Sequence, residues 1–239
     1  MTTRVGRLTA SDPEFDAALI YETACILMTL HGVSRWFGIA MFASASGLGF
    51  TPATLDGIQY LIAERKFGKV SAMSKFEADF RRLVTQGKDP NALALEGTRL
   101  TTENRLSQAE TMFRRALKLG GANFSYKWMA QRGLGYVIHT QNAQSEEARH
   151  LFEEVYTTHP LDVARELSQM YQSSQQPERA RDVLFRLALH KDPSAYDRLA
   201  ELELGLAWDA PNASQKKDHE TWAMEFQRLR TLGGRSQVS

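Results

Sequence analysis

Hydrophobic residues recur every three or four positions along most of the chain, which is the spacing of one face of an α-helix. Proline stands at the start of such segments, as at Pro90 and Pro193, where it loses no helical hydrogen bond. Thr51, Asp89 and Asp192 each come directly before a proline and are predicted to cap a helix N-terminus. No alternating β-branched segment is flanked by an Asn-Gly or Asp-Gly turn. The pattern therefore predicts an all-α chain.

Twelve helices with short connections are expected, and they pair into six hairpins. The segment 107–110, Ser-Gln-Ala-Glu, indicates a capping box at the start of one of them. The expected ranges are 12–31, 33–46, 52–66, 70–87, 90–103, 107–119, 124–141, 145–158, 161–173, 177–190, 193–207 and 214–232.

A repeat is visible when the hairpins are compared. One unit is Leu93-x3-Gly97-x2-Leu100-x8-Ala109-x3-Phe113-x2-Ala116, and another is Ala164-x2-Leu167-x3-Tyr171-x8-Ala180-x3-Leu184-x2-Leu187. Small residues at the helix crossings with large apolar residues beside them resemble the tetratricopeptide repeat. The stretched turn at 141–145 is similar to the Sel-one-like subclass. The resemblance extends over residues 53–232, with Trp222, Phe226 and Leu229 in the second-helix positions of the last unit.

This resemblance implies an α/α superhelical solenoid of about six stacked helical hairpins, since each hairpin needs its neighbours to bury its apolar stripe. We expect residues 1–50 to form an N-terminal apolar hairpin that caps the array, residues 51–232 to form the repeats, and residues 233–239 to fray. The apolar hairpin either packs wholly into the array or exposes a surface for a partner or a membrane face.

The resemblance also implies that the first helices line a concave groove that binds an extended peptide or a partner helix. In the better repeats the groove positions are polar and aromatic residues, namely Arg132, Tyr136, His139, Arg165, Gln169 and Gln172. Such side chains suit contacts with a peptide. The alternative is a solvated polar face with no partner.

Arginines on the second helices have two possible roles. Neighbouring helices could align Arg81, Arg114 and Arg181 into a basic ridge for phosphate or an acidic partner. Each of them also has a glutamate three or four residues earlier, which favours ordinary pairs within one helix.

The composition removes several classes of function. The 29 basic and 28 acidic residues give the 239-residue chain a net charge of +1, so no global field favours nucleic acid, and no specific nucleic-acid partner is expected. Cys25 is the single cysteine, which excludes an intramolecular disulfide. Glu22, His31 and Arg35 interrupt the most apolar region, so no transmembrane segment is expected.

Candidate catalytic motifs fail on their spacing. Gly47-Leu48-Gly49 lacks the third glycine of a dinucleotide-binding motif, and Ser46 is not in a nucleophile elbow. The six histidines include no pair four residues apart with a glutamate between them. Cys25 lies in an apolar stretch typical of a buried, inert thiol. No catalytic residue, cofactor or metal is predicted, and the protein is not expected to be an enzyme.

The sequence thus predicts a protein–protein interaction scaffold or adaptor in the cytoplasm. The alternative is an assembly or accessory factor of a mitochondrial or membrane-associated complex. Arg4 and Arg7 among threonines weakly resemble a mitochondrial transit peptide, although acidic residues follow at once.

Overall fold

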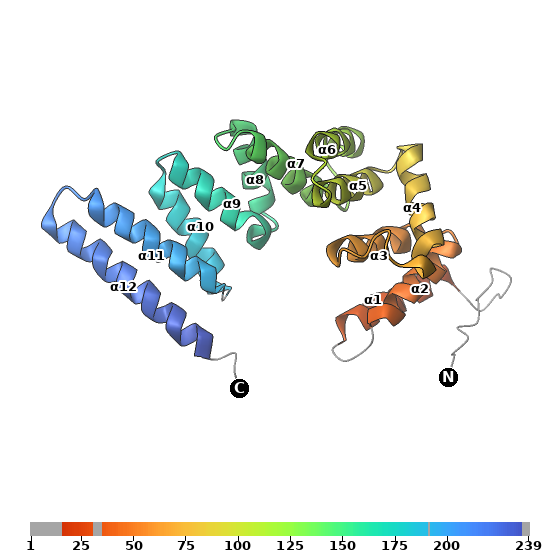
Figure 1. The fold of residues 1–239 in the computed structure, drawn as a ribbon, viewed down its shortest axis with the longest axis horizontal. Helices are drawn as coiled ribbons and strands as arrows, with labels where there is room; N and C mark the ends of the chain where they lie inside the picture. Colours follow the sequence, from red (N-terminus) through yellow and green to blue (C-terminus); the bar gives the residue numbers. More distant parts are fainter. Residues whose placement is uncertain (1–15, 31–34, 191, 236–239) are drawn as a thin grey trace. The chain divides into compact units, whose positions relative to one another are not determined.

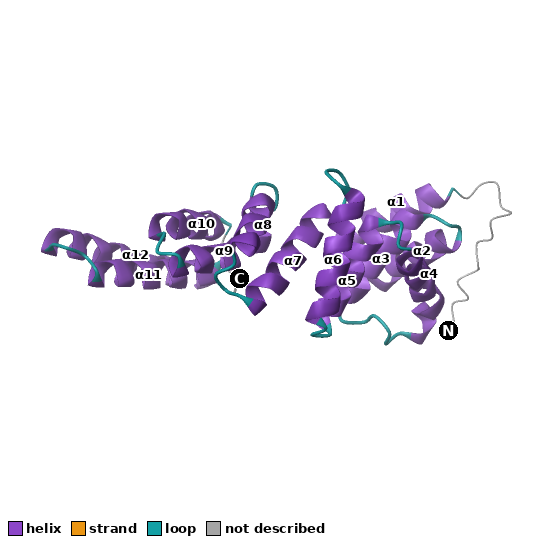
Figure 2. Cartoon of the chain, turned by 90° about the horizontal axis from the view of Figure 1, so that it is seen from above, coloured by secondary structure: helices purple, strands orange, loops and turns teal. Residues whose placement is uncertain are grey.

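The chain is folded into helices throughout the part that can be described. The computed structural model describes residues 16–30, 35–190 and 192–235, and these ranges hold twelve α-helices, one 3₁₀ turn and no strand (Figure 1). Figure 2 shows the same helices from above, joined by short loops. The predicted all-α class is confirmed.

Contacts divide the chain into two units, residues 1–133 and 134–239. The helices of unit 1 are α1 (Ala17–Thr29), α2 (Arg35–Gly47), α3 (Thr51–Ala63), α4 (Ser74–Gln86), α5 (Pro90–Thr102) and α6 (Leu106–Gly120), with the 3₁₀ turn η1 (Ser71–Met73) before α4. Helix α7 (Lys127–Gln141) contains the division. The helices of unit 2 are α8 (Glu146–Tyr156), α9 (Pro160–Ser173), α10 (Pro177–Leu189), α11 (Pro193–Trp208) and α12 (Ala213–Arg235).

Two of the three predicted aspartate and threonine caps are confirmed. Asp89 accepts a hydrogen bond from the backbone N–H of Asn91 at 2.8 Å, and Asp192 accepts one from Ser194 at 2.9 Å. Thr51 was predicted to cap α3, but this prediction is wrong because Thr51 is already the first residue of the helix. Helix α6 begins at Leu106, one residue before the predicted capping box at 107–110. The predicted box therefore lies inside the first turn of this helix.

The ends of the chain differ from the expectation at one point. Helix α12 continues through Gly233 and Gly234 to Arg235, so the helix ends beyond the predicted residue 232. Residues 236–239 of the predicted frayed tail lie outside the described residues, as does the segment around Arg4 and Arg7.

Glycines on the first helices of unit 1 allow aromatic rings of the second helices to pack closely. A Cβ atom at Gly97 of α5 would lie 2.5 Å from the ring of Phe113, and one at Gly133 of α7 would lie 2.2 Å from the same ring. Phe113 is fully buried between these two helices. Ala109 is also fully buried, as the repeat pattern predicts.

Unit 2 repeats this arrangement. A Cβ atom at Gly135 of α7 would lie 2.8 Å from the ring of Phe152 on α8. Ala148, Phe152 and Ala180 are all fully buried. The close spacing of Gly133 and Gly135 therefore serves helix packing in both units.

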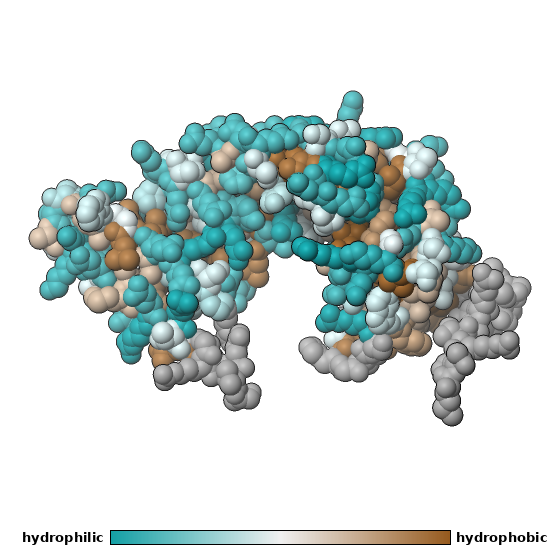
Figure 3. Space-filling view, viewed as in Figure 1, coloured by the Kyte–Doolittle hydropathy of each residue, from teal (hydrophilic) through white to brown (hydrophobic). Residues whose placement is uncertain are grey.

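The last helix buries one of the three residues that match the repeat pattern. Phe226 is buried with Ala223, whereas Trp222 is 54% exposed and Leu229 is 43% exposed. Phe226 therefore packs in the core as Phe113 and Phe152 do, whereas the other two residues of the pattern lie at the surface. Figure 3 shows hydrophobic residues reaching the surface among hydrophilic ones in this part of the molecule.

The N-terminal hairpin has one buried face and one exposed face. Helix α1 packs on α2, and α2 packs on α3. Ile20, Ala24, Ile39 and Phe42 lie in the core, and large apolar residues are exposed elsewhere on the same helices, namely Leu19, Ile26, Leu30, Trp36 and Phe37.

Candidate functional site

Helix α9 has a mainly apolar buried face and a polar exposed face. Leu167 and its apolar neighbours on α9 are buried, while Arg165, Gln169 and Gln172 are exposed. These three residues lie four and three positions apart, so the helical period places them on one side of α9. The structure therefore brings the three predicted groove residues of this helix together.

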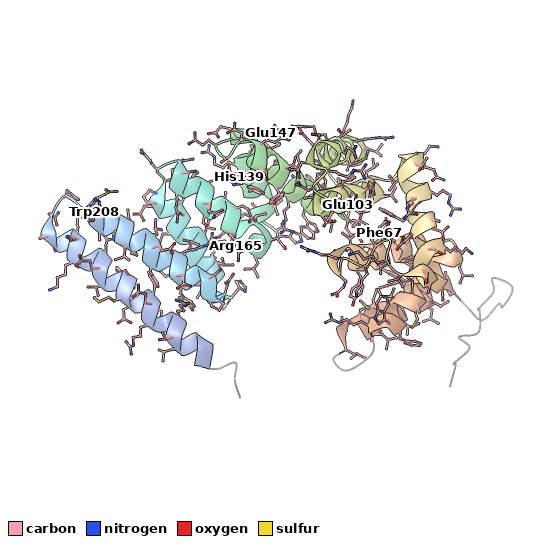
Figure 4. The ribbon with its side chains drawn as sticks, in the orientation of Figure 1. Phe67, Glu103, His139, Glu147, Arg165 and Trp208 are labelled. Atoms are coloured by element: carbon pink, nitrogen blue, oxygen red, sulfur yellow. The ribbon has the colours of Figure 1, made fainter. Side chains whose placement is uncertain are left out.

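The other predicted groove residues lie on α7. Tyr136 is 43% exposed, and His139 is half-buried with its ring edge against Phe152, at 6.3 Å between ring centroids. The Nδ1 atom of His139 is buried and has no hydrogen-bond partner among the described residues. Arg132 is exposed on the same helix but belongs to unit 1. Figure 4 shows His139 on α7 and Arg165 on α9.

Charged side chains on the second helices are paired within the chain. Arg81 and Arg114 contact Glu77 and Glu110 of their own helices at 3.3 Å and 2.9 Å, which favours the intrahelical interpretation over a basic ridge. Glu146 and Glu153 of α8 pair with Arg149 of the same helix, and Glu153 also pairs with Arg179 of α10. By contrast, the side chains of Arg165, Gln169 and Gln172 on α9 have no hydrogen-bond or ion-pair partner in the described part of the chain.

An open hollow of about 480 Å³ lies beside Gln172, between the C-terminal ends of α9 and α11. Residues that line it include Gln172, Gln175, Glu201, Leu202, Leu206 and Asp209. The α11 residues were not among the groove positions predicted from the sequence. The signal was present, because residues 201, 205 and 209 follow the same spacing of about four residues that selects the exposed face of α9.

A buried carboxylate joins three helices of unit 2. Glu203 of α11 is 1% exposed, and its oxygens accept hydrogen bonds from the Arg181 guanidinium of α10 at 2.7 Å and 3.2 Å. The Nδ1 atom of His219 on α12 lies 2.7 Å from the same carboxylate. A buried charge with two such partners is a structural contact, and its partners are too distant in sequence for local patterns to reveal it.

A tyrosine of the α9 core is also bonded to a charge. The Tyr171 hydroxyl donates to Glu153 of α8 at 2.8 Å, and the Arg179 guanidinium lies over its ring at 5.4 Å. Burial raises the pKa of Tyr171 to about 12, with the nearby Glu153 acting in the same direction.

Unit 1 has a comparable tyrosine and aspartate cluster. The Tyr21 hydroxyl of α1 donates to Asp56 of α3 at 2.6 Å, and the Tyr126 hydroxyl donates to the other oxygen of the same carboxylate. The hydrogen bond to Asp56 raises the pKa of Tyr21, and burial is the main cause that raises the pKa of Tyr126. The cluster fixes α1 and the start of α7 onto α3.

Two of the candidate catalytic side chains, Ser46 and Cys25, lie within helix packing. The Ser46 hydroxyl bonds with that of Thr54 at 2.7 Å inside the core, and Cys25 is half-buried in α1. Among the described residues there is no group of three histidine, cysteine or acidic side chains placed to hold a metal ion. No described helix has both the length and the hydrophobicity that crossing a bilayer requires.

Comparison with known proteins defines the fold. No protein-family model matches the sequence, and no curated protein does. The structure is similar to the crystal structure of a Sel1 repeat protein from Oxalobacter formigenes, with a TM-score of 0.56 over 88% of each chain and 14% identical residues. The chain has a Sel1-like helical-repeat fold. The solenoid class expected from the repeat pattern is thereby confirmed.

Proposed function

We propose that this Sel1-like protein is a non-catalytic scaffold that binds a peptide or a helix of another protein along its first helices. The observation that carries the proposal is the exposed face of α9, where Arg165, Gln169 and Gln172 have no partner within the described chain. Hydrogen-bonding groups left available on one side of a rigid helix can bind a partner without first breaking internal contacts. Tyr136 adds an exposed aromatic side chain on α7.

The groove residues outside this face have defined roles in the proposal. Tyr136 supplies a flat apolar contact, a side chain that is enriched at protein interfaces. His139 supplies one edge of its ring, because the opposite side packs on Phe152. Arg132 would extend the surface toward the N-terminal part of α7.

The test is proximity labelling in the native cell with the tag at the C-terminus. The groove variant combines Tyr136→Ala with Arg165→Glu, and the matched control is Lys217→Glu, an exposed charge reversal on α12. All three substituted residues are exposed, so the groove variant and the control are both expected to fold. We expect the wild type and the control to label the same proteins and the groove variant to lose them at least about tenfold. Equal labelling by all three proteins contradicts the proposal.

The exposed apolar residues of the N-terminal hairpin favour a second candidate, an accessory factor of a mitochondrial or membrane-associated complex. Ile26 is 61% exposed and Phe37 is 52% exposed, and apolar surface of this kind suits attachment to another protein or to a membrane face. Fractionation of native cells tests this function. Membrane association that is lost in the double variant Ile26→Ser with Phe37→Ser supports it, and recovery of the wild type in the soluble fraction contradicts it.

A further inference from the structure

The hollow between α9 and α11 has a negative electrostatic character. Glu201 and Asp209 line it, and neither carboxylate has an ion-pair or hydrogen-bond partner in the described part of the chain. No lysine or arginine is among the lining residues. Gln172 and Gln175 add two amide side chains whose oxygens can accept hydrogen bonds.

The helix ends around the hollow carry partial charges of both signs, because the N-terminus of α10 at Pro177 is partly positive, so the net negative charge comes from Glu201 and Asp209. Helices α9 and α11 run in the same direction (Figure 1), and the hollow lies at their C-terminal ends, near Ser173 and Trp208. The last carbonyl groups of a helix carry partial negative charge, which favours a cation and disfavours a carboxylate. Asp209 is the C-cap residue of α11, so its charge is unfavourable there unless a cation approaches.

The same hollow has apolar walls. Leu202 and Leu206 of α11 and Pro177 at the start of α10 line it beside the polar groups. A Cβ atom at Gly205 would meet nothing within 4 Å, so the wall is open at this residue. Trp208, which Figure 4 labels at the end of α11, is 88% exposed and precedes Asp209 directly. Apolar walls with carboxylates suit a long cationic side chain, whose methylene groups need apolar contact, better than a bare ion.

We propose that this hollow binds a lysine or arginine side chain of the partner segment, with Glu201 and Asp209 as the residues that recognise its charge. The inference rests on the proposed function, since the segment that lies along Gln169 and Gln172 of α9 would deliver the side chain. It adds a specificity that the exposed face of α9 does not itself contain, namely a preference for a basic residue.

The test uses the full chain and an array of short random peptides in which one central position is fixed as lysine, arginine, glutamine or glutamate. We expect wild-type protein to bind the lysine and arginine sets at least about tenfold more strongly than the glutamate set. The variant Glu201→Gln with Asp209→Asn should lose this preference. The control Asp182→Asn with Asp218→Asn removes two exposed acidic charges from α10 and α12 and should keep it.

A charge-reversal variant separates lost recognition from misfolding, because a misfolded protein would not gain binding to the glutamate set. The variant Glu201→Lys with Asp209→Lys should reverse the preference and bind the glutamate set most strongly. Wild-type binding that does not depend on the fixed residue overturns the inference and leaves the scaffold function in place. Absence of binding to every peptide set, together with unchanged labelling by the Tyr136 and Arg165 groove variant, overturns both.

Discussion

At the scale of single residues, the ring of Phe113 leaves no space for a side chain at two neighbouring glycines. This ring is fully buried between α5 and α7, and a methyl group at Gly97 or Gly133 would lie within 2.5 Å of it. Since glycines contact the ring from two helices, it cannot move away from one without meeting the other. Gly205 of α11 shows the opposite situation, with nothing near its missing Cβ atom.

The same substitution should therefore have opposite effects at two glycines. Gly97→Ala gains about 1 kcal/mol of helix propensity but overpacks the core at a cost of roughly 1–3 kcal/mol, so we expect net destabilisation. Gly205→Ala should stabilise the protein by about 0.5–1 kcal/mol because only the propensity changes. Urea denaturation of both variants measures the difference. Equal free energies of unfolding would show that Phe113 can relax away from α5.

Tyr171 predicts a dependence of stability on alkaline pH. Its pKa is raised from 10.0 to about 12, so the folded state keeps the phenol proton where the unfolded state releases it. The resulting stability is complete below pH 10 and is lost as the pH rises to 12, by about 2 kcal/mol in total. We expect unfolding free energies of Tyr171→Phe to decrease less across this window than those of the wild type. Parallel curves for the two proteins would argue against the shift.

At the scale of helices, the Glu203 carboxylate connects three elements, α10, α11 and α12. Arg181 of α10 and His219 of α12 both bond to it, and Ala223 and Phe226 are the residues that α12 buries nearby. His219 and Glu220 are half-buried, and the other residues of α12 up to Leu232 are exposed. This buried carboxylate therefore adds a polar connection to the apolar packing that attaches the last helix.

Removal of this carboxylate should destabilise unit 2. Glu203→Ala leaves the Arg181 guanidinium without its buried partner, and we expect a loss of about 3 kcal/mol. The matched control is Glu178→Ala, because Glu178 contacts the same guanidinium from the exposed surface and should cost less than about 1 kcal/mol. Thermal and urea denaturation test both variants. A control that loses as much as Glu203→Ala would mean that burial of the pair does not matter.

At the scale of the whole molecule, a repeat fold transmits stability only between neighbouring hairpins. The two units keep separate sets of internal contacts, so a defect in one is expected to stay local. This organisation suits a binding scaffold, because each pair of first helices can present its own side chains.

Hydrogen exchange of the Glu203→Ala variant tests this locality. We expect backbone amides of α10, α11 and α12 to exchange faster than in the wild type, while those of α3, α4 and α5 keep their protection. Mass spectrometry of peptide fragments resolves the helices. Uniform loss of protection along the chain would instead indicate a single cooperative unit.

The sequence alone determined the helices and the residues that pack between them. Caps at Asp89 and Asp192 and prolines at helix starts act within one turn, so their effect can be recognised locally, and the small residues Gly97 and Ala109 can be recognised because they recur in a repeat pattern. The error at Thr51 arose because α3 begins one residue earlier than the position before the proline indicates, with Phe50 as its N-cap residue.

Tertiary structure decided which surfaces remain available and which charges are buried. Glu203 meets residues 22 positions before it and 16 after it, and the hollow unites the ends of two separate helices. The spacing of Arg165, Gln169 and Gln172 predicted one face, but only packing could add Glu201 and Asp209 beside it. Local periodicity fixes the direction of a side chain from its own helix, whereas its neighbours depend on how distant segments pack.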